Sequence, residues 1–304
     1  MSSKVINQHY VPQFYLRHFN LPLSGQLAAL DKAVPRTFTT QSRNVAAQKF
    51  FYDFEGDEIF RAPGLTAQPL ESLYSLIEGE MSRNWNILID NLERLGGFDP
   101  SDKERMSFYI HAQLHRTPQH RRLMNETLRD LIRQELEAKQ AAGTLIVPEK
   151  WQHLTLDHLA GSLKHHPANF TLHDQQTMKE HQAQLREMHW QILRADGRIP
   201  FITSDAPVQH TPGRLKDTNE RFVTVTYPIS PRYLLFLTPT LGQSGPDCQV
   251  ASTTEEQVRS MNQLQVMAAE RQVYASSNDW TALIGHDPLE FVRQIPAALR
   301  RPAQ

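Results

Sequence analysis

Polar side chains that could bind a ligand or move a proton lie near the start of the chain. Residues 9–19 contain six large apolar or aromatic side chains. Four side chains that can hydrogen-bond a ligand lie among them: His9, Gln13, Arg17 and His18. Pro12 suits the first turn of a short helix, which would place His9 at the positive end of the helix dipole. We predict that His9 is a general base or ligand contact, with Tyr10 and Gln13 in the same site. The alternative is a histidine that holds this segment in place.

Two glutamates, Glu71 and Glu78, lie on a long predicted helix. Apolar residues recur with helical spacing over residues 70–95, with Pro69 before the first turn and Gly96 after the last. The glutamates are seven residues apart, so they share one flank with their α-carbons about 10 Å apart. They are too distant to share a proton, but both could border one cleft and supply carboxylates for a metal ion or a base.

Gln113 and Arg116 lie one turn apart on a second predicted helix, which Pro118 must kink or end. The Arg116 guanidinium could hold a carboxylate or phosphate in a bidentate contact. It could equally cap the interrupted turn or pair with Glu71 or Glu78. We predict that Arg116 makes a salt bridge or shares a ligand contact with this pair of glutamates.

The same helix carries His111 and His115 at positions i and i+4, the spacing of a metal-chelating pair. Because the chain contains 14 histidines, this spacing is weak evidence, and we favour a solvated helix face. We therefore assign no metal ligands from the sequence, although the carboxylates above could hold a divalent ion.

Ser204 and Asp205 follow a predicted strand and precede a proline, in a position where functional loops are common. Asp205 could act as a general base or metal ligand, with Ser204 as a ligand contact. The alternative is a turn stabilised by side-chain hydrogen bonds to the backbone. We also predict that His9, Gln113, Arg116 and this loop converge on one pocket.

Several of these segments resemble those of a known family. Residues 9–19 are similar to the opening motif of the domain-of-unknown-function 4238 family, a mostly bacterial set of soluble proteins. Three later segments fit the same family in the same order: residues 113–118, 201–208 and 227–231. Asn262 fits its C-terminal part, and the resemblance implies that it contributes to the ligand site. One position departs from the pattern, since the family would have Asn where Ala206 stands.

The composition excludes several classes of protein. With 32 basic and 33 acidic residues the formal net charge is −1, which argues against a uniformly basic nucleic-acid binder. The single cysteine excludes an internal disulfide and a zinc site of several cysteines. No run of 18 apolar residues indicates a membrane span, so we expect a cytoplasmic protein without a membrane partner.

The order of predicted elements indicates a mixed α+β fold in one domain. Residues 1–68 and 189–285 are typical of strands with few helices, and residues 69–188 of an inserted helical layer. We expect one mostly antiparallel sheet built from the N- and C-terminal strands, including a hairpin over residues 189–203. Residues 286–304 are expected to be a tail.

The function that we predict from these residues is a hydrolase, of phosphodiesterase or nuclease type, acting on a nucleotide or nucleic acid. His9, Asp205, Glu71 and Glu78 would be catalytic, and a divalent metal ion could serve as cofactor. Six residues would contact the anionic substrate: Tyr10, Gln13, Gln113, Arg116, Ser204 and Asn262. The alternative is a non-catalytic ligand-binding or interaction protein, in phage defence or regulation, in which the same residues hold the N-terminal segment and a ligand.

Overall fold

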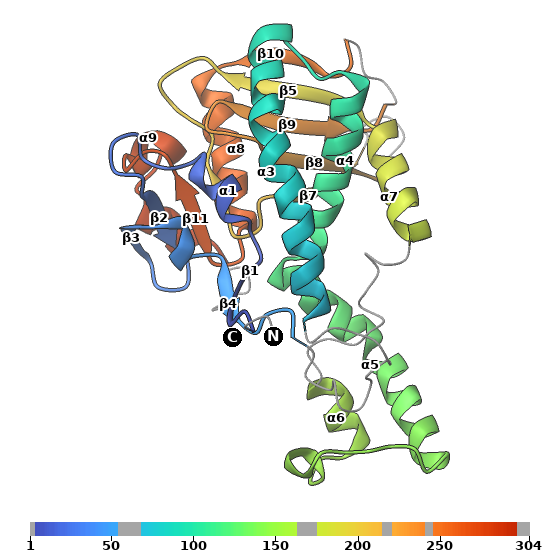
Figure 1. Cartoon of the computed structure of the whole chain (residues 1–304). Helices are drawn as coiled ribbons and strands as arrows, with labels where there is room; N and C mark the ends of the chain where they lie inside the picture. Colours follow the sequence, from blue (N-terminus) through green and yellow to red (C-terminus); the bar gives the residue numbers. More distant parts are fainter. Residues whose placement is uncertain (1–3, 54–67, 163–174, 215–220, 241–245, 297–304) are drawn as a thin grey trace.

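The computed structural model describes residues 4–53, 68–162, 175–214, 221–240 and 246–296. Its fold is α+β, as predicted, with long helices packed on three sheets (Figure 1). The largest sheet has five strands, in this order: β10 (Gln249–Thr253), β5 (His189–Ala195), β9 (Tyr233–Thr238), β8 (Arg221–Pro228) and β7 (Gln209–Arg214). β10 runs parallel to β5, and the other pairs are antiparallel.

A four-stranded antiparallel sheet joins the two ends of the chain. Its order is β3 (Arg36–Thr40), β2 (Leu27–Asp31), β11 (Gln272–Ala275) and β6 (Thr203–Ser204). The N-terminal strands therefore pair with C-terminal strands, as predicted. A separate two-stranded sheet consists of β1 (Asn7–His9) and β4 (Ala47–Lys49).

The prediction of a single sheet is wrong, and so is the hairpin over residues 189–203. β5 pairs with β9 and β10, and the chain then crosses to the other sheet, where β6 pairs with β11. Pro200 and Pro207 lie on either side of β6, and because proline has no backbone N–H they keep this strand short. Three apolar residues of the crossing are buried without the alternation of a strand: Ile199, Phe201 and Ile202. They pack in the core around α8 (Glu255–Ala268).

The five-stranded sheet separates two hydrophobic cores. α3 (Pro69–Leu95) and α4 (Pro100–His115) cover one face, with α7 (Gln175–Glu187) beside α4, and α8 lies behind the sheet (Figure 1). Neighbouring residues of β9 alternate between the two faces. Leu235 and Leu237 belong to the core under α3 and α4, whereas Leu234 belongs to the core around α8.

Local sequence sets the limits of the long helices. α3 begins with Pro69 in its first turn and ends at Gly96, whose φ of 70° is left-handed. Asp99 caps α4 by accepting a hydrogen bond from its first turn. Pro118 ends α4 and occupies the first turn of α5 (Pro118–Ala141). Thr117, just before it, caps α5 by accepting a hydrogen bond from the N–H of His120.

The apolar N-terminal segment is packed into the protein. α1 (Gln13–Arg17) places the ring of Tyr15 against Trp85 and Tyr227, with ring centres 5.6 and 5.5 Å away. The Tyr15 hydroxyl also bonds to Thr203 and to the Pro228 carbonyl, both at 2.7 Å. Three further side chains of this segment are fully buried: Val11, Leu16 and Phe19.

Most of α5, together with α6 (Leu156–Ser162), extends away from the sheets as an arm (Figure 1). The arm has a small core of its own, formed by Ile132, Leu136, Leu159 and Ala160. It also contains the 3-10 helix η2 (Glu149–Trp151).

Three short helices complete the described chain: η1 (Ser42–Asn44), α9 (Trp280–Ile284) and α10 (Pro288–Gln294). α10 occupies part of the expected tail at residues 286–304, while residues 297–304 lie outside the described part of the chain. None of the described helices combines the length and the apolar character needed to cross a membrane.

Candidate functional site

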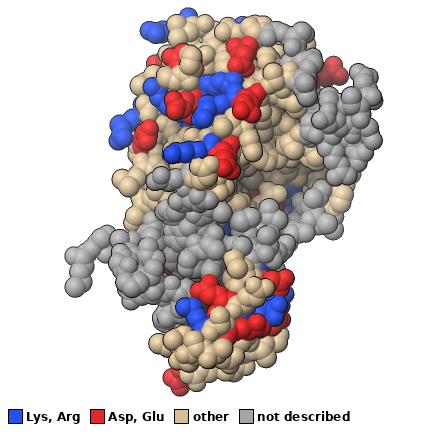
Figure 2. Space-filling view, turned by 90° about the vertical axis from the view of Figure 1, so that its right-hand side faces the viewer, with Lys and Arg blue, Asp and Glu red and all other residues tan. Residues whose placement is uncertain are grey.

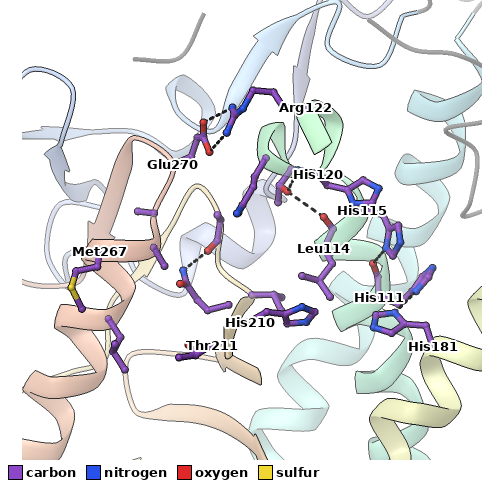
Figure 3. Close-up of a pocket in the computed structure, with 18 of the residues that line it drawn as sticks. His111, Leu114, His115, His120, Arg122, His181, His210, Thr211, Met267 and Glu270 are labelled. Atoms are coloured by element: carbon purple, nitrogen blue, oxygen red, sulfur yellow. Dashed lines mark hydrogen bonds and ion pairs between the residues drawn. The ribbon is translucent and has the colours of Figure 1, made fainter. Parts of the chain in front are cut away.

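A cavity of about 940 Å³ lies where α4 meets α5, bordered by α7, β7 and the C-terminal end of α8 (Figure 3). Five histidines line it from four of these elements: His111, His115, His120, His181 and His210. Apolar side chains also line it, several of them from α8: Ala206, Val208, Leu264, Met267, Ala268 and Ala269. Figure 3 shows Met267 across the cavity from the histidines, so the cavity has a polar side and an apolar side.

The five histidine side chains are here called the histidine cluster, and four of them, His111, His115, His120 and His181, are in contact. Nδ1 of His111 is 2.7 Å from Nδ1 of His181. The ring centres of His111 and His115 are 4.1 Å apart, and that of His120 lies 4.4 Å from that of His115. The contacts therefore run continuously from α7 to the start of α5.

Burial keeps the imidazoles of the cluster uncharged. It lowers the pKa of His111 and His120 to about 3 and that of His181 to about 4, and the neighbouring histidines add to these shifts. Burial is also the main cause that lowers the pKa of His115 and His210. Each ring therefore presents one N–H group and one lone pair at neutral pH.

Hydrogen bonds define which ring nitrogens are available to a ligand. Nδ1 of His115 lies 2.8 Å from the carbonyl oxygen of His111, which can only accept, so Nδ1 carries the proton and Nε2 the lone pair. One Nδ1 of the His111–His181 pair donates to the other. Nε2 of His111 is buried and has no hydrogen-bond partner among the described residues. The cluster thus has bonding capacity that the described protein groups do not use.

Two charged side chains in the described wall of the cavity are paired with each other. Arg122 of α5 and Glu270, which follows α8, form an ion pair in which Nη2 donates to Oε2 at 2.8 Å. This wall accordingly offers hydrogen-bonding and apolar groups rather than an excess of one charge. Imidazole is the group in it best suited to hold a metal ion. In the part of the chain that the structure describes, no three His, Cys, Asp or Glu side chains are already arranged around a metal position.

Arg116, predicted as a site residue, is buried at the junction of α4 and the N-terminal segment. Its Nη2 donates to Glu78 Oε1 and to the His9 carbonyl oxygen, both at 2.5 Å. The predicted salt bridge with α3 is therefore confirmed. Glu71 lies on the same helix, and burial, together with the charge of Glu78, raises its pKa.

Gln113 and His9 fasten the segment that precedes α1. Gln113 Nε2 donates to the Tyr10 carbonyl oxygen at 3.0 Å. The His9 ring is 3.3 Å from the Arg43 carbonyl oxygen and 3.5 Å from Gln13 Nε2. The structure thus brings together six of the predicted site residues: His9, Tyr10, Gln13, Glu78, Gln113 and Arg116.

Ser204 is the last residue of β6, and Asp205 lies in the turn that follows. Both oxygens of the Asp205 carboxylate are used by the backbone N–H groups of residues 270–272, at 2.7 to 2.8 Å. Burial raises the pKa of Asp205 to about 7, while these three donors act in the opposite direction. Ser204 Oγ accepts a hydrogen bond from Gln265 at 2.7 Å.

Asn262 of α8 hydrogen-bonds the backbone of the segment that crosses from β5 to β6. It accepts from the N–H of Ile202 at 3.1 Å and donates to the carbonyl oxygens of Pro200 and Leu283 at 3.0 and 2.9 Å. Like the other residues predicted to bind or catalyse, Asn262 is not among the described residues that line the cavity. Their roles in binding or catalysis stay predictions.

The histidine cluster is the feature that the sequence interpretation missed. The prediction that His111 and His115 lie on a solvated helix face is wrong. His111 is fully buried, and both side chains line the cavity. Their i, i+4 spacing is the available signal. The other three histidines come from separate elements, so the fold is needed to bring them together.

The family model described as "Protein of unknown function (DUF4238)" matches residues 7–279. The matched range includes every residue of the histidine cluster as well as the predicted site residues. No curated protein and no solved structure matches the chain. The match confirms the resemblance seen in the sequence motifs: the chain belongs to the DUF4238 family.

Proposed function

We propose that this protein binds a small molecule in the histidine-lined cavity. The observation that carries the proposal is the cavity itself, whose volume of about 940 Å³ is typical of small-molecule sites. Its wall combines apolar side chains with a limited set of polar atoms, as such sites commonly do. The ligand would have an apolar body facing α8 and a hydrogen-bonding edge facing the histidine cluster.

The charge pattern favours a ligand that is hydrogen-bonding rather than strongly anionic. Arg122 is paired with Glu270, and burial holds the imidazoles neutral. Figure 2 shows basic and acidic side chains interleaved on the visible face, including the arm, instead of a continuous basic surface. Such a face does not favour binding along a nucleic-acid backbone, which relies on clustered Lys and Arg.

A second candidate is hydrolysis of a phosphate-containing substrate in the same cavity. The observation that favours it is the His115 ring, whose Nδ1–H is bonded to the His111 carbonyl so that Nε2 is left as a base. Glu78 and Asp205 are occupied by Arg116 and by the backbone. In this candidate His115 would therefore move the proton, in the cytoplasmic setting expected from the sequence.

A neutral fluorescent probe tests the binding proposal. N-phenyl-1-naphthylamine has an aromatic body and one N–H group, and its fluorescence rises in apolar surroundings. We expect saturable binding of one probe per chain. Ala268→Trp, at an exposed position of the cavity wall, should weaken this binding at least about tenfold by filling the space.

Ala138→Trp provides the matched control, since Ala138 is exposed on α5 and does not line the cavity. Equal probe binding by the Ala268 variant and the wild type would reject the proposal. The hydrolase candidate is tested with bis(p-nitrophenyl) phosphate. It predicts release of p-nitrophenolate by the wild type and loss of this activity in His115→Gln.

A further inference from the structure

Three rings of the histidine cluster come from two helices that pack against each other. His111 and His115 are one turn apart on α4, and His181 lies on α7. Their ring centres are separated by 4.1, 5.0 and 6.0 Å. Two imidazoles that bind one tetrahedral ion, with metal–nitrogen bonds of about 2.05 Å, have ring centres about 5 Å apart. The three separations bracket this value.

We propose that His111, His115 and His181 bind a divalent transition-metal ion such as Zn²⁺. Nε2 of His115 would be one ligand, because its Nδ1 is bonded to the His111 carbonyl oxygen. The other two ligands would be the Nδ1 atoms of His111 and His181, which already face each other. Three protein nitrogens leave the fourth position of a tetrahedral ion for water or another ligand.

A small opening of the His111–His181 pair is needed for this coordination. The two Nδ1 atoms are 2.7 Å apart, the distance of a hydrogen bond. Two nitrogens on one tetrahedral ion are about 3.3 Å apart, so the pair must open by about 0.6 Å. As the described side chains are placed, no three His, Cys, Asp or Glu residues among them could hold a metal ion, so the site forms only when this pair opens. Two metal–nitrogen bonds would replace the one hydrogen bond that is lost.

The surroundings of the three rings favour a metal ion. The His115–carbonyl hydrogen bond fixes one tautomer, which is the usual support for a histidine that binds a metal. The two Nδ1 atoms of His111 and His181 point at each other from facing helices, so one ion placed between them would meet both. Burial keeps the rings neutral, so binding releases no net proton, but the ring whose Nδ1 donates in the free protein must carry that proton on its Nε2 when the ion binds. Imidazole ligands favour Zn²⁺, Cu²⁺ or Ni²⁺ over Mg²⁺ and Ca²⁺.

Metal titrations of the full-length, tag-free protein test this inference. Protein stripped with EDTA and dialysed would be titrated with Zn²⁺ by calorimetry, and with Co²⁺ followed by visible absorption. We expect one ion per chain, the absorption of four-coordinate Co²⁺, and no binding of Mg²⁺. His181→Gln should lower the affinity for Zn²⁺ at least about tenfold.

His210→Gln is the matched control, because it makes the same change in the same cavity outside the three proposed ligands. It should bind Zn²⁺ as the wild type does. The inference is overturned if the wild type takes up no Zn²⁺, or if His181→Gln binds it equally well. An equal loss in His210→Gln would reject this set of ligands. If His181→Gln does not fold, His115→Gln makes the same comparison.

The metal inference shares a cavity with the proposed function but does not depend on an organic ligand. Zn²⁺ binding in a protein that ignores the naphthylamine probe would support the metal site and reject the small-molecule site. Binding of the probe without binding of Zn²⁺ would support the small-molecule site and reject the metal site.

Discussion

Asp205 connects the turn after β6 to the start of β11 through its carboxylate. Oδ1 accepts from the N–H of residue 270, and Oδ2 accepts from those of residues 271 and 272. The three N–H donors favour the ionised carboxylate against the effect of burial, and hydrogen bonds to an ionised acceptor are stronger than neutral ones. The side chain is 1% exposed, so water cannot replace these bonds. These bonds reach residues 65 to 67 positions further along the chain, so they are not those of a local turn. The local bond is made by Ser204, whose Oγ accepts from the N–H of Ala206 at 3.1 Å.

Asp205→Asn should therefore destabilise the protein. An amide has one oxygen, and its NH₂ group would face a backbone N–H that needs an acceptor. We expect the free energy of unfolding, measured with urea, to fall by about 1–3 kcal/mol. Asp130→Asn, at a side chain that is 84% exposed, should change it by no more than about 0.5 kcal/mol. An unchanged unfolding free energy for Asp205→Asn would contradict the assigned role.

Single residues differ in how well their contacts could be predicted. The partner of Arg116 follows from local features, because Pro118 fixes the end of α4 and helical spacing fixes the flank that carries Glu78. The contact between His111 and His181 joins residues 70 apart in sequence and depends on how α7 packs. No periodicity in the sequence contains that information.

The junction between α3 and α4 depends on the Arg116–Glu78 pair. Arg116 is 2% exposed, so loss of its charged partner leaves a buried cation with only neutral acceptors. We expect Glu78→Gln to lower the unfolding free energy by about 1.5–3 kcal/mol. Glu71→Gln should have a smaller effect, because burial and the charge of Glu78 already disfavour the ionised Glu71. Equal losses in chemical denaturation would show that the ion pair is not the cause.

The N-terminal segment is predicted to be indispensable for folding. Deleting residues 1–19 would remove α1 and uncover Trp85 and Tyr227, against which Tyr15 packs. We expect insoluble protein in a fractionation assay. Tyr15→Phe keeps the ring and removes only the hydroxyl, so it should stay soluble with reduced stability. A soluble truncation that unfolds in one sharp transition would contradict this prediction.

Helices were more predictable than sheets because their signals are local. The apolar spacing of residues 70–95, with Pro69 and Gly96 at its ends, matches α3 closely. The residues around Pro200 have the composition of a strand. They are nevertheless buried by packing in the core around α8, and they do not pair with a neighbouring strand. Strand pairing is decided by such distant contacts, so the number of sheets could not be read from the chain.

On the scale of the whole molecule, the arm should unfold separately from the sheets. Its core of Ile132, Leu136, Leu159 and Ala160 is distinct from the two larger cores. Leu136→Ala should speed amide hydrogen exchange in α5 and α6 without changing exchange in the sheets. Leu88→Ala, made at an equally buried residue of α3, should instead lower global stability by about 2–5 kcal/mol. An equal loss of global unfolding free energy from both changes would show that the arm, the sheets and the helices packed on them unfold as one unit.

Neighbouring residues of β9 face different cores, so the two cores cannot be separated from each other. Each core uses the same strand as part of its wall, so neither is complete when the other is taken away. β2 repeats the arrangement, with Ala29 in one core and Leu30 in the other. A deletion that removed either strand would therefore open both cores at once. We therefore expect the sheets and the helices on both sides of them to unfold together in one transition.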